Sequence, residues 1–373
     1  MPMSGCASPI GVPASPLLLD ERVRAAWYDT QGPAEEVLEV GQLPDPVPPP
    51  GELRVSVRYS GVNPGDTKKR RGWLGSTMPY PRVVPHSDAA GVIDRVGDGV
   101  KPDRIGQRVW VYGAQSYRPF GTAAEYVTVP DHLAVGLPDN LPDELGACLR
   151  IPGITAHRAV FGDGPVDGAT ILVHGVLGAV GAVAGQLARW GGATVIGTVR
   201  RRSDLPNHDL LAAHHVIALD TAHAVAQIRE LAAGGVDRIV EVAFSDNADL
   251  DAAITKVGTV IAAYATRDER PAFPFWPMLF DNVTIRLLGS DDFPSEAKHQ
   301  AAADLTDAAA AGALNIAIGD PLSLPQIAAA HERVDTDNRR RVGLLRPSSP
   351  AARVGAGRGR WAGASTPCRQ PAR

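Results

Sequence analysis

A glycine-spaced turn between an apolar strand and an amphipathic helix is the feature that most limits what this chain can fold into. Residues 171–181 read ILVHGVLGAVG, so that Gly175, Gly178 and Gly181 follow an apolar run at three-residue spacing. In a unit of this kind the first glycine permits a tight turn, the second lets the backbone approach a pyrophosphate, and the third lets the helix pack against the strand. The stretch predicts a dinucleotide-binding turn; the alternative is a close-packed connection without a ligand.

The start of the following helix adds to this prediction. A helix N-terminus offers free N–H groups and a partial positive charge of about half an elementary unit, both of which favour phosphate. Residues 179–190 place their apolar side chains on one helical face, as a surface helix of an α/β sheet does. The residues that we expect to contact the cofactor phosphates are Gly175, Leu177, Gly178, Ala179, Val180 and Gly181.

The end of the next strand indicates which dinucleotide is bound. A NAD site usually has an Asp or Glu there for the ribose 2′-hydroxyl, whereas residues 197–203 read GTVRRRS and no acid comes before Asp204. Arginines would give a 2′-phosphate charge-assisted hydrogen bonds worth about 1.5–3 kcal/mol each. We therefore expect NADPH; the alternative is a solvated basic edge. The residues assigned to this part of the site are Thr198, Arg200, Arg201 and Arg202.

The pattern around the turn alternates between apolar strands and helices. Because parallel strands joined by helices are buried on both faces, this alternation predicts a doubly wound parallel sheet. One of the expected helices spans residues 204–213. The expected strands are residues 169–174, 193–199, 215–219, 236–243, 259–265 and 283–288.

The segment before this unit differs, because its short strands alternate polar and apolar residues. Alternation of this type is typical of an antiparallel, barrel-like domain with one wet face. We predict a flexible leader at residues 1–22, a barrel-like catalytic domain at 23–148 and 290–345, a dinucleotide-binding domain at 149–289, and a disordered basic tail at 346–373.

Composition excludes several function classes. The net charge of −4 gives no general attraction to nucleic acid or to anionic membranes, and we expect no partner of either kind. No apolar run approaches the roughly 20 residues that a membrane helix needs. The three cysteines are scattered singly, which fits a reducing cytoplasm. We therefore expect a cytoplasmic protein.

Several motifs together resemble one family. They are GVNPGDTKKRRG at 61–72, HSDAAGVIDRVGDGV at 86–100, GTAAEYV at 121–127, IPGITAHRAV at 151–160, and the glycine turn. This combination is similar to the medium-chain dehydrogenases/reductases, and within them to the zeta-crystallin-like NADPH:quinone oxidoreductases. The resemblance covers residues 23–345 and implies a GroES-like barrel domain combined with a Rossmann domain that binds NADP.

The resemblance also predicts that no metal is bound. Zinc alcohol dehydrogenases of this superfamily have a Cys ligand where this chain has Asn63, and their His ligand falls on Ser87, with His86 one place too early. A catalytic zinc needs about three protein ligands, usually His, Cys or carboxylate. Asp88 alone cannot bind a zinc ion. We expect His86 to be a polar loop residue rather than a catalytic one.

The resemblance further implies which residues lie at the nicotinamide. Asn63 lies beside it and donates an amide N–H to the acceptor oxygen; the alternative is a turn-forming Asn before Pro64. Thr155 is similar to a family threonine near the nicotinamide, and helix capping is its alternative. Tyr264 and Ala265 lie just past the fifth strand, at the carboxyl edge of the sheet, where their backbone would contact the nicotinamide amide.

Two neighbouring features modify these expectations. Leu219 stands where some relatives have a tyrosine beside the 2′-phosphate, which shifts phosphate binding onto the arginines. His174 precedes the turn, and we expect it to be a hydrogen-bonded structural residue rather than a proton donor.

Without a metal to polarise its substrate, such an enzyme needs an acceptor that is already electron-poor. A quinone fits this requirement; an enone, alkenal or enoyl thioester is the alternative, and a non-catalytic NADPH-binding protein that serves a structural, sensing or RNA-binding role is a second one. We expect a homodimer joined at the strand edge of residues 283–288, because an exposed sheet edge needs to be covered.

Overall fold

The apolar runs after residue 169 form the strands of one six-stranded parallel sheet, whose central strands are largely buried. The structure is a computed structural model, and it describes residues 22–206, 210–336 and 343–347. The strand order β10-β9-β8-β11-β12-β13 starts at the centre and reverses direction once, as the predicted doubly wound sheet requires. The strands are β8 (Thr170–Val173), β9 (Thr194–Val199), β10 (His215–Ala218), β11 (Val236–Glu241), β12 (Thr255–Ala263) and β13 (Thr284–Leu287).

Helices cover this sheet as predicted, except that one expected helix is not formed in the described residues. They are α4 (Thr155–Phe161), α5 (Ala179–Trp190), α6 (Ala224–Leu231), α7 (Phe244–Ile254) and α8 (Phe275–Phe280). The helix expected at 204–213 is wrong for the described residues of that stretch, which hold only the end of a short 3-10 turn. Arg189 donates to the carbonyls of Leu210 and Leu211, so those carbonyls bond to α5 instead of to a helix of their own.

The remaining strands form the predicted antiparallel, barrel-like lobe. Its main sheet has the order β14-β15-β3-β4-β5-β7, with β6 on β3, and β1 and β2 form a separate ribbon. Only the β14–β15 pair is parallel in this sheet. The strands are β1 (Arg22–Trp27), β2 (Glu39–Pro44), β3 (Glu52–Val62), β4 (Asp88–Val96), β5 (Arg108–Val111), β6 (Tyr126–Pro130), β7 (Ala134–Gly136), β14 (Leu322–Ser323) and β15 (Gly343–Arg346).

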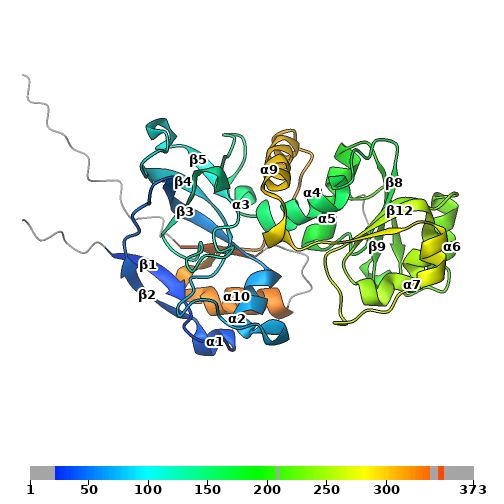
Figure 1. The fold of residues 1–373 in the computed structure, drawn as a ribbon, viewed down its shortest axis with the longest axis horizontal. Coiled ribbons are helices and arrows are strands. Elements are labelled where there is room, and N and C mark those ends of the chain that lie inside the picture. Colours follow the sequence, from blue (N-terminus) through cyan, green and yellow to red (C-terminus); the bar gives the residue numbers. More distant parts are fainter. Residues whose placement is uncertain (1–21, 207–209, 337–342, 348–373) are drawn as a thin grey trace, which may run out of the picture.

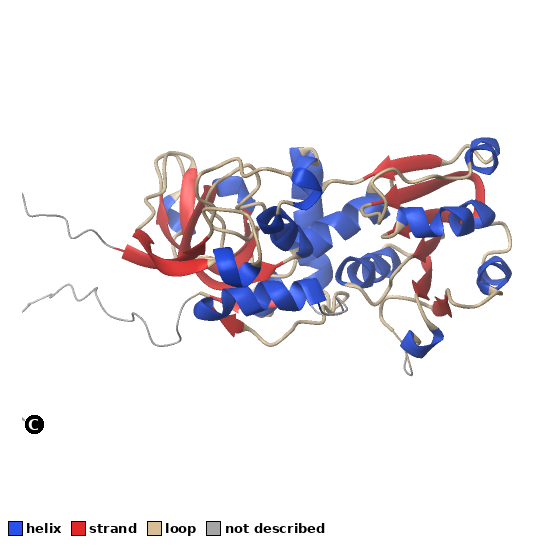
Figure 2. Ribbon diagram, turned by 90° about the horizontal axis from the view of Figure 1, so that it is seen from below, coloured by secondary structure: helices blue, strands red, loops and turns tan. Residues whose placement is uncertain are grey.

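The two sheets lie in separate lobes with helices between them (Figure 1). Seen from below, the same arrangement holds, with the two sets of strands at either end (Figure 2). Helix α9 (Ser295–Ala310) lies between the lobes with α4 and α5, while α10 (Ile327–Thr336) returns to the barrel-like lobe. The short helices α1 (Ala34–Val37), α2 (Pro64–Arg71) and α3 (Asp143–Gly146) belong to that lobe too.

Helix α9 contacts both lobes. Trp110 of β5 donates its indole N–H to Thr306 at 3.1 Å, and Leu305 packs against Gly153, just before α4. One continuous hydrophobic core therefore runs from the barrel-like sheet through α9 to the parallel sheet. Each fully buried Leu or Ile in it contributes about 1.5–3 kcal/mol relative to exposure.

The predicted domain bounds, 23–148 with 290–345 and 149–289, stay a prediction. The leader and the tail predicted at 1–22 and 346–373 lie outside the described residues, apart from Arg22, Arg346 and Pro347. Within the described ranges, no helix has both the length and the apolar character that crossing a membrane demands.

The glycine turn depends on the missing side chain of Gly181. A Cβ at Gly181 would lie 2.3 Å from the carbonyl oxygen of Gly175, which is backbone and cannot move aside easily, whereas a Cβ at Gly65 of α2 meets only Ile151 at 4.0 Å. We expect Gly181→Ala to lower the free energy of unfolding by about 1–3 kcal/mol. Gly65→Ala, the matched control, should leave it unchanged or raise it by about 0.5–1 kcal/mol. Urea unfolding followed by circular dichroism measures both, and equal effects would contradict the close approach.

Candidate active site

The glycine turn has the geometry that the sequence predicts. Gly175 adopts a φ of 64°, a left-handed value that glycine permits, and the chain then enters α5 after Gly178. Val176 donates its N–H to the carbonyl of Thr198 at 3.1 Å, so the turn is bonded to the end of β9. The turn is half-buried at its outer residues Leu177, Gly178, Ala179 and Val180.

The end of β9 separates two kinds of predicted cofactor residue. Thr198 is fully buried beneath the turn, where its carbonyl accepts from Val176. Arg200, Arg201 and Arg202 are exposed just beyond it, and none forms an ion pair with another described residue. The three guanidinium groups are therefore available to an anion at this edge.

Tyr264 and Ala265 follow β12 at the carboxyl edge of the parallel sheet. The N–H of Tyr264 donates to the carbonyl of Glu241, and the carbonyl of Ala265 accepts from the N–H of Phe244 at the start of α7. Both residues are half-buried. Their backbone is thus held at the edge where open α/β sheets bind ligands.

Asn63 is held in a defined orientation by a buried carboxylate. Its side-chain Nδ2 donates to Oδ2 of Asp88 at 2.8 Å, and its backbone N–H donates to Asp66 at 2.8 Å. Asn63 precedes α2 as its N-cap residue and is 3% exposed. The turn-forming role and the predicted orientation of the amide are therefore both compatible with its position.

Asp88 joins Asn63 to the segment before α4. Its Oδ2 also accepts from the N–H of Ile151 at 3.2 Å, whereas its Oδ1 has no hydrogen-bond partner within the described part of the chain. The nearest cation is Arg150, with Nε 3.9 Å from Oδ1. Burial raises the pKa of Asp88 to about 7, although Arg150 opposes this. Asp66, also fully buried, has its pKa raised to about 6 for the same reason.

An ionic cluster links these residues to the end of the dinucleotide-binding lobe. Asp291 pairs with Arg150 at 2.5 Å and with Lys69 at 3.1 Å, and it accepts from Ser116 at 2.8 Å. Burial would raise the pKa of Asp291, but Arg150 and Lys69 hold it well below its usual range. The carboxylate is therefore charged and ties α2 and η4 (Arg150–Ile154) to the chain that leaves β13.

Thr155 begins α4 directly after an irregular turn. The segment η4 has the wider π-helical hydrogen bonding, which is rare and is often found at functional sites. It packs against α5, the helix that starts at the glycine turn. Asp88 links Asn63 to Ile151 of this segment, and Thr155 follows the segment directly.

The residues at the position of a catalytic zinc do not fit that metal. Asn63 and Ser87 are not usual zinc ligands, and the one carboxylate, Asp88, already accepts two N–H groups at Oδ2. His86 cannot complete the set, because both ring nitrogens are occupied: Nδ1 by Ser60 at 2.9 Å and Nε2 by His331 at 2.9 Å.

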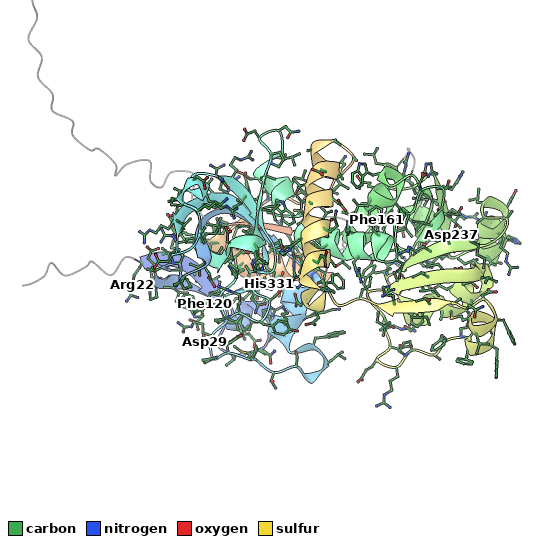
Figure 3. The ribbon with its side chains drawn as sticks, turned by 45° about the horizontal axis from the view of Figure 1, so that its top comes forward. Arg22, Asp29, Phe120, Phe161, Asp237 and His331 are labelled. Atoms are coloured by element: carbon green, nitrogen blue, oxygen red, sulfur yellow. The ribbon has the colours of Figure 1, made fainter. Side chains whose placement is uncertain are left out.

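His86 is in a loop, as expected, but it is fully buried, which the sequence interpretation did not foresee. Arg70 can only donate, so His331 accepts at Nδ1 and donates from Nε2 to His86. His86 in turn donates to Ser60. The chain continues from Ser60 to Thr122 and ends at the carbonyl of Asp88. Burial lowers the pKa of His86 to about 3 and that of His331 well below its ordinary value, which keeps both rings neutral. Figure 3 labels His331 in the barrel-like lobe.

A second buried polar group lies beneath the glycine turn, where His174 contacts Glu241 and Asp251. Among the described residues these three form the one group of ligating side chains whose atoms lie within 4.8 Å of one another. Hydrogen bonds occupy most of their polar atoms: Glu241 accepts from the Ala243 N–H and from Asn247, and His174 uses both ring nitrogens, one of them with Oδ1 of Asp251. The expectation that His174 is hydrogen-bonded is confirmed.

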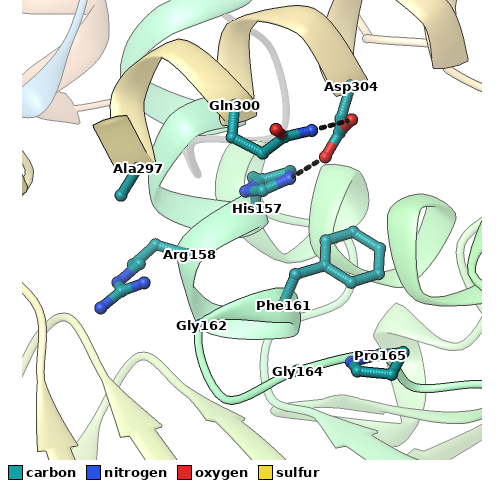
Figure 4. A pocket seen from close by; sticks show the side chains of 9 residues that line it. All are labelled: His157, Arg158, Phe161, Gly162, Gly164, Pro165, Ala297, Gln300 and Asp304. Carbon is teal, nitrogen blue, oxygen red and sulfur yellow. Dashed lines mark hydrogen bonds and ion pairs between the residues drawn. The ribbon is translucent and has the colours of Figure 1, made fainter. Parts of the chain in front are cut away.

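A pocket of about 330 Å³ lies between α4 and α9, away from the predicted site residues (Figure 4). His157 bonds to Asp304 at 2.7 Å on one wall, and Gln300 bonds to the same carboxylate. Thr155, at the opposite end of α4, does not line it. The pocket is therefore separate from the candidate active site.

Sequence interpretation missed several residues of the site. Asp66, Arg150, Asp291 and His331 lie far apart in the chain, and no spacing in the sequence connects them. The sequence indicates Asp88 only as an insufficient metal ligand, whereas in the structure it is the residue that orients Asn63. The one sequence signal for these partners is the presence of acidic residues beside apolar strands, because a buried charge needs a partner.

Comparison with known proteins supports one family. Residues 49–139 match the family described as "Alcohol dehydrogenase GroES-like domain", and residues 179–304 match "Zinc-binding dehydrogenase". The quinone oxidoreductase of Homo sapiens is 30% identical over 310 residues, which cover 82% of this chain and 92% of that protein. The quinone oxidoreductase of Rattus norvegicus is 31% identical over 293 residues, which cover 78% and 87% of the two chains.

Solved structures agree with this result. A Pseudomonas syringae quinone oxidoreductase superposes with a TM-score of 0.75 at 22% identity and covers 87% of this chain and all of its own, which shows the fold. A mycobacterial protein solved as its NADPH complex has a TM-score of 0.71 at 26% identity and covers 87% and 100%. Together, the barrel-like and doubly wound lobes, the glycine turn and these matches show that the chain belongs to the quinone oxidoreductase branch of the medium-chain dehydrogenase/reductase superfamily.

Proposed function

We propose that this oxidoreductase uses NADPH, without zinc, to reduce a quinone-type acceptor. The observation that carries the proposal is the Asn63–Asp88 pair, which stands where zinc relatives keep metal ligands and presents an oriented amide instead. The exposed arginines after β9 support NADPH over NADH. The relatives named quinone oxidoreductases support the acceptor class.

The dinucleotide supplies a hydride when it is bound; the residues of the chain orient both reactants. The glycine turn and the N-terminus of α5 would hold the phosphates of the dinucleotide, and Arg200, Arg201 and Arg202 would hold the 2′-phosphate. The carboxylate of Asp88 takes one amide hydrogen of Asn63, which directs the other toward the acceptor oxygen. That N–H stabilises the negative charge that develops there as hydride adds.

The acceptor class is decided by activity. Oxidation of NADPH with a panel of quinones, enones, alkenals and enoyl thioesters should be fastest with quinones. Preferred turnover of an enone or thioester would identify a double-bond reductase instead. Stoichiometric binding without oxidation of any of them would identify a non-catalytic NADPH-binding protein.

The exposed edge of the parallel sheet suits a second copy of the chain. Strand β13 pairs only with β12 in the described sheet, and its Leu287 is 77% exposed. Beside it, α8 exposes Trp276 and Phe280 at 65% and 71%. Pairing of two β13 edges would cover unpaired backbone groups and this aromatic surface together, so we propose a homodimer. The free buried thiol of Cys148 fits a cytoplasmic location.

The basic edge provides the test of cofactor choice. Replacing Arg200 and Arg201 by Ala should raise the KM for NADPH by about 10- to 150-fold per arginine, while the KM for NADH changes little, because only NADPH has the 2′-phosphate. Arg333→Ala, which removes a charge from α10, is the control and should change neither value. Steady-state kinetics with both dinucleotides measures this, and equal losses would refute the assignment.

The role of Asn63 predicts a loss confined to the chemical step. Asn63→Ala should lower kcat by about 10²- to 10³-fold, because it removes a donor aimed at the developing charge. The Kd for NADPH should stay near that of the native protein, and Asn140→Ala on the surface should change neither quantity. Stopped-flow oxidation of NADPH and fluorescence titration separate the two effects. An unchanged kcat would leave Asn63 with only its turn-forming role.

The dimer prediction concerns the aromatic edge. Phe280→Asp combined with Leu287→Asp should convert a two-chain species into a monomer, since both charges would be buried at the joined edge. Val47→Asp places a charge on a side chain that is 74% exposed in the other lobe and should leave the dimer intact. Light scattering at micromolar concentration measures the masses; a monomeric native protein would contradict the proposal.

A further inference from the structure

The strongest unassigned feature is the buried polar group beneath the glycine turn. His174 directly precedes Gly175, and its Nδ1 lies 2.9 Å from the hydroxyl of Thr198. Its Nε2 lies 2.9 Å from Asp251 and 3.3 Å from Glu241. We call His174, Thr198, Glu241 and Asp251 the turn-base cluster; all four side chains are fully buried or nearly so.

The cluster holds the turn from both sides of its first glycine. The side chain of His174, before Gly175, bonds to the hydroxyl of Thr198, and the N–H of Val176, after it, bonds to the carbonyl of the same threonine. Gly175 itself is in the left-handed region, with a φ of 64°. The direction in which the turn presents its N–H groups therefore depends on the position of His174 relative to β9.

The turn-base cluster carries a net negative charge when all of its titratable groups are deprotonated. It has two carboxylates and one imidazole, and among the described residues Tyr264 also faces it. Burial raises the pKa of Tyr264, and Glu241 adds to this rise. Burial disfavours the charge on His174, but Glu241 and Asp251 outweigh it and raise its pKa. Burial raises the pKa of Glu241 to about 7. Oδ2 of Asp251 has no hydrogen-bond partner within the described residues.

Proton binding at this cluster and phosphate binding at the turn favour each other. A bound pyrophosphate adds negative charge next to a buried group that becomes more negative as it loses protons. Interactions between buried charges are only weakly screened by salt. The proton on His174 also sets the polarity of its bond to Thr198, because Nδ1–H donates when the ring is charged and Nδ1 accepts when it is neutral.

We propose that His174 is a positioning residue of the dinucleotide site and that the proton occupancy of the turn-base cluster sets the affinity for the dinucleotide. Binding then takes up a proton. The dissociation constant rises as pH rises through the range in which the free protein loses that proton, and it levels off where the complex loses it as well. The inference rests on dinucleotide binding at the turn, but not on the acceptor or on the choice between NADPH and NADH.

Fluorescence titration of the native protein with NADPH and with NADH, from about pH 7 to about pH 9.5, tests this. The Kd should rise by up to about tenfold per pH unit, the limit for one linked proton. A rise shared by both dinucleotides does not come from the 2′-phosphate. Calorimetry in buffers of different ionisation enthalpy should show fractional proton uptake on binding.

Asp251→Asn and Thr198→Val separate the effect of the cluster's charge from the effect of its hydrogen bond to the turn. Asp251→Asn keeps an oxygen acceptor for His174 but removes one charge, and should reduce the slope of log Kd against pH to less than half. Asp304→Asn is the matched control, because Asp304 also pairs with a buried histidine, His157 at 2.7 Å, but away from the turn. It should keep the native slope.

Thr198→Val provides a measurement if Asp251→Asn fails to fold. It leaves all charges in place and removes the hydroxyl, so Kd should increase by a similar factor at every pH while the slope is retained. A native Kd that is independent of pH, or an equal slope in native protein and Asp251→Asn, would overturn the inference. Neither result depends on turnover, so failure of the proposed quinone activity remains a distinct outcome.

Discussion

The close approach of α5 to the glycine turn is the constraint around which the dinucleotide-binding lobe is arranged. The helix passes so near the Gly175 carbonyl that residue 181 has no room for a side chain. The same helix meets the neighbouring crossover at Gly185, where a Cβ would lie 1.9 Å from the carbonyl of Ala212. Because two glycines let α5 lie this close to the turn and to the neighbouring crossover, its N-terminus points at the carboxyl ends of β8 and β9. The cofactor site follows from backbone packing before any polar side chain contributes.

The junction of the lobes is organised by charge. Asp291 follows the last strand of the parallel sheet and pairs with Arg150 of η4 and Lys69 of α2. Arg150 in turn faces Asp88, which orients Asn63. Buried ions that lack full pairing are costly, so this alternation of acid and base fixes the relative positions of the segments as well as their charge.

Short-range sequence patterns predicted the fold well, but they predicted the buried hydrogen bonds and ion pairs poorly. The glycine spacing and the apolar strands predicted the doubly wound sheet because both are consequences of local geometry and burial. The helix expected at 204–213 failed because Arg189, distant in sequence, takes the carbonyls of that segment. Burial of His86 escaped notice for a similar reason, since its partner His331 comes 245 residues later. The roles of Asn63, Thr155 and the arginines remain predictions.

The hydrogen-bond chain that starts at Arg70 has a consequence for how the barrel-like lobe is completed. An arginine has no lone pair to offer, so every hydrogen along His331, His86, Ser60 and Thr122 points the same way, toward the carbonyl of Asp88. None of these bonds can be reversed alone. Before α10 docks, the imidazole of His86 is free to adopt either tautomer; afterwards it has one. Helix α10 thus determines the tautomer of His86, which lies 245 residues before His331 in the chain.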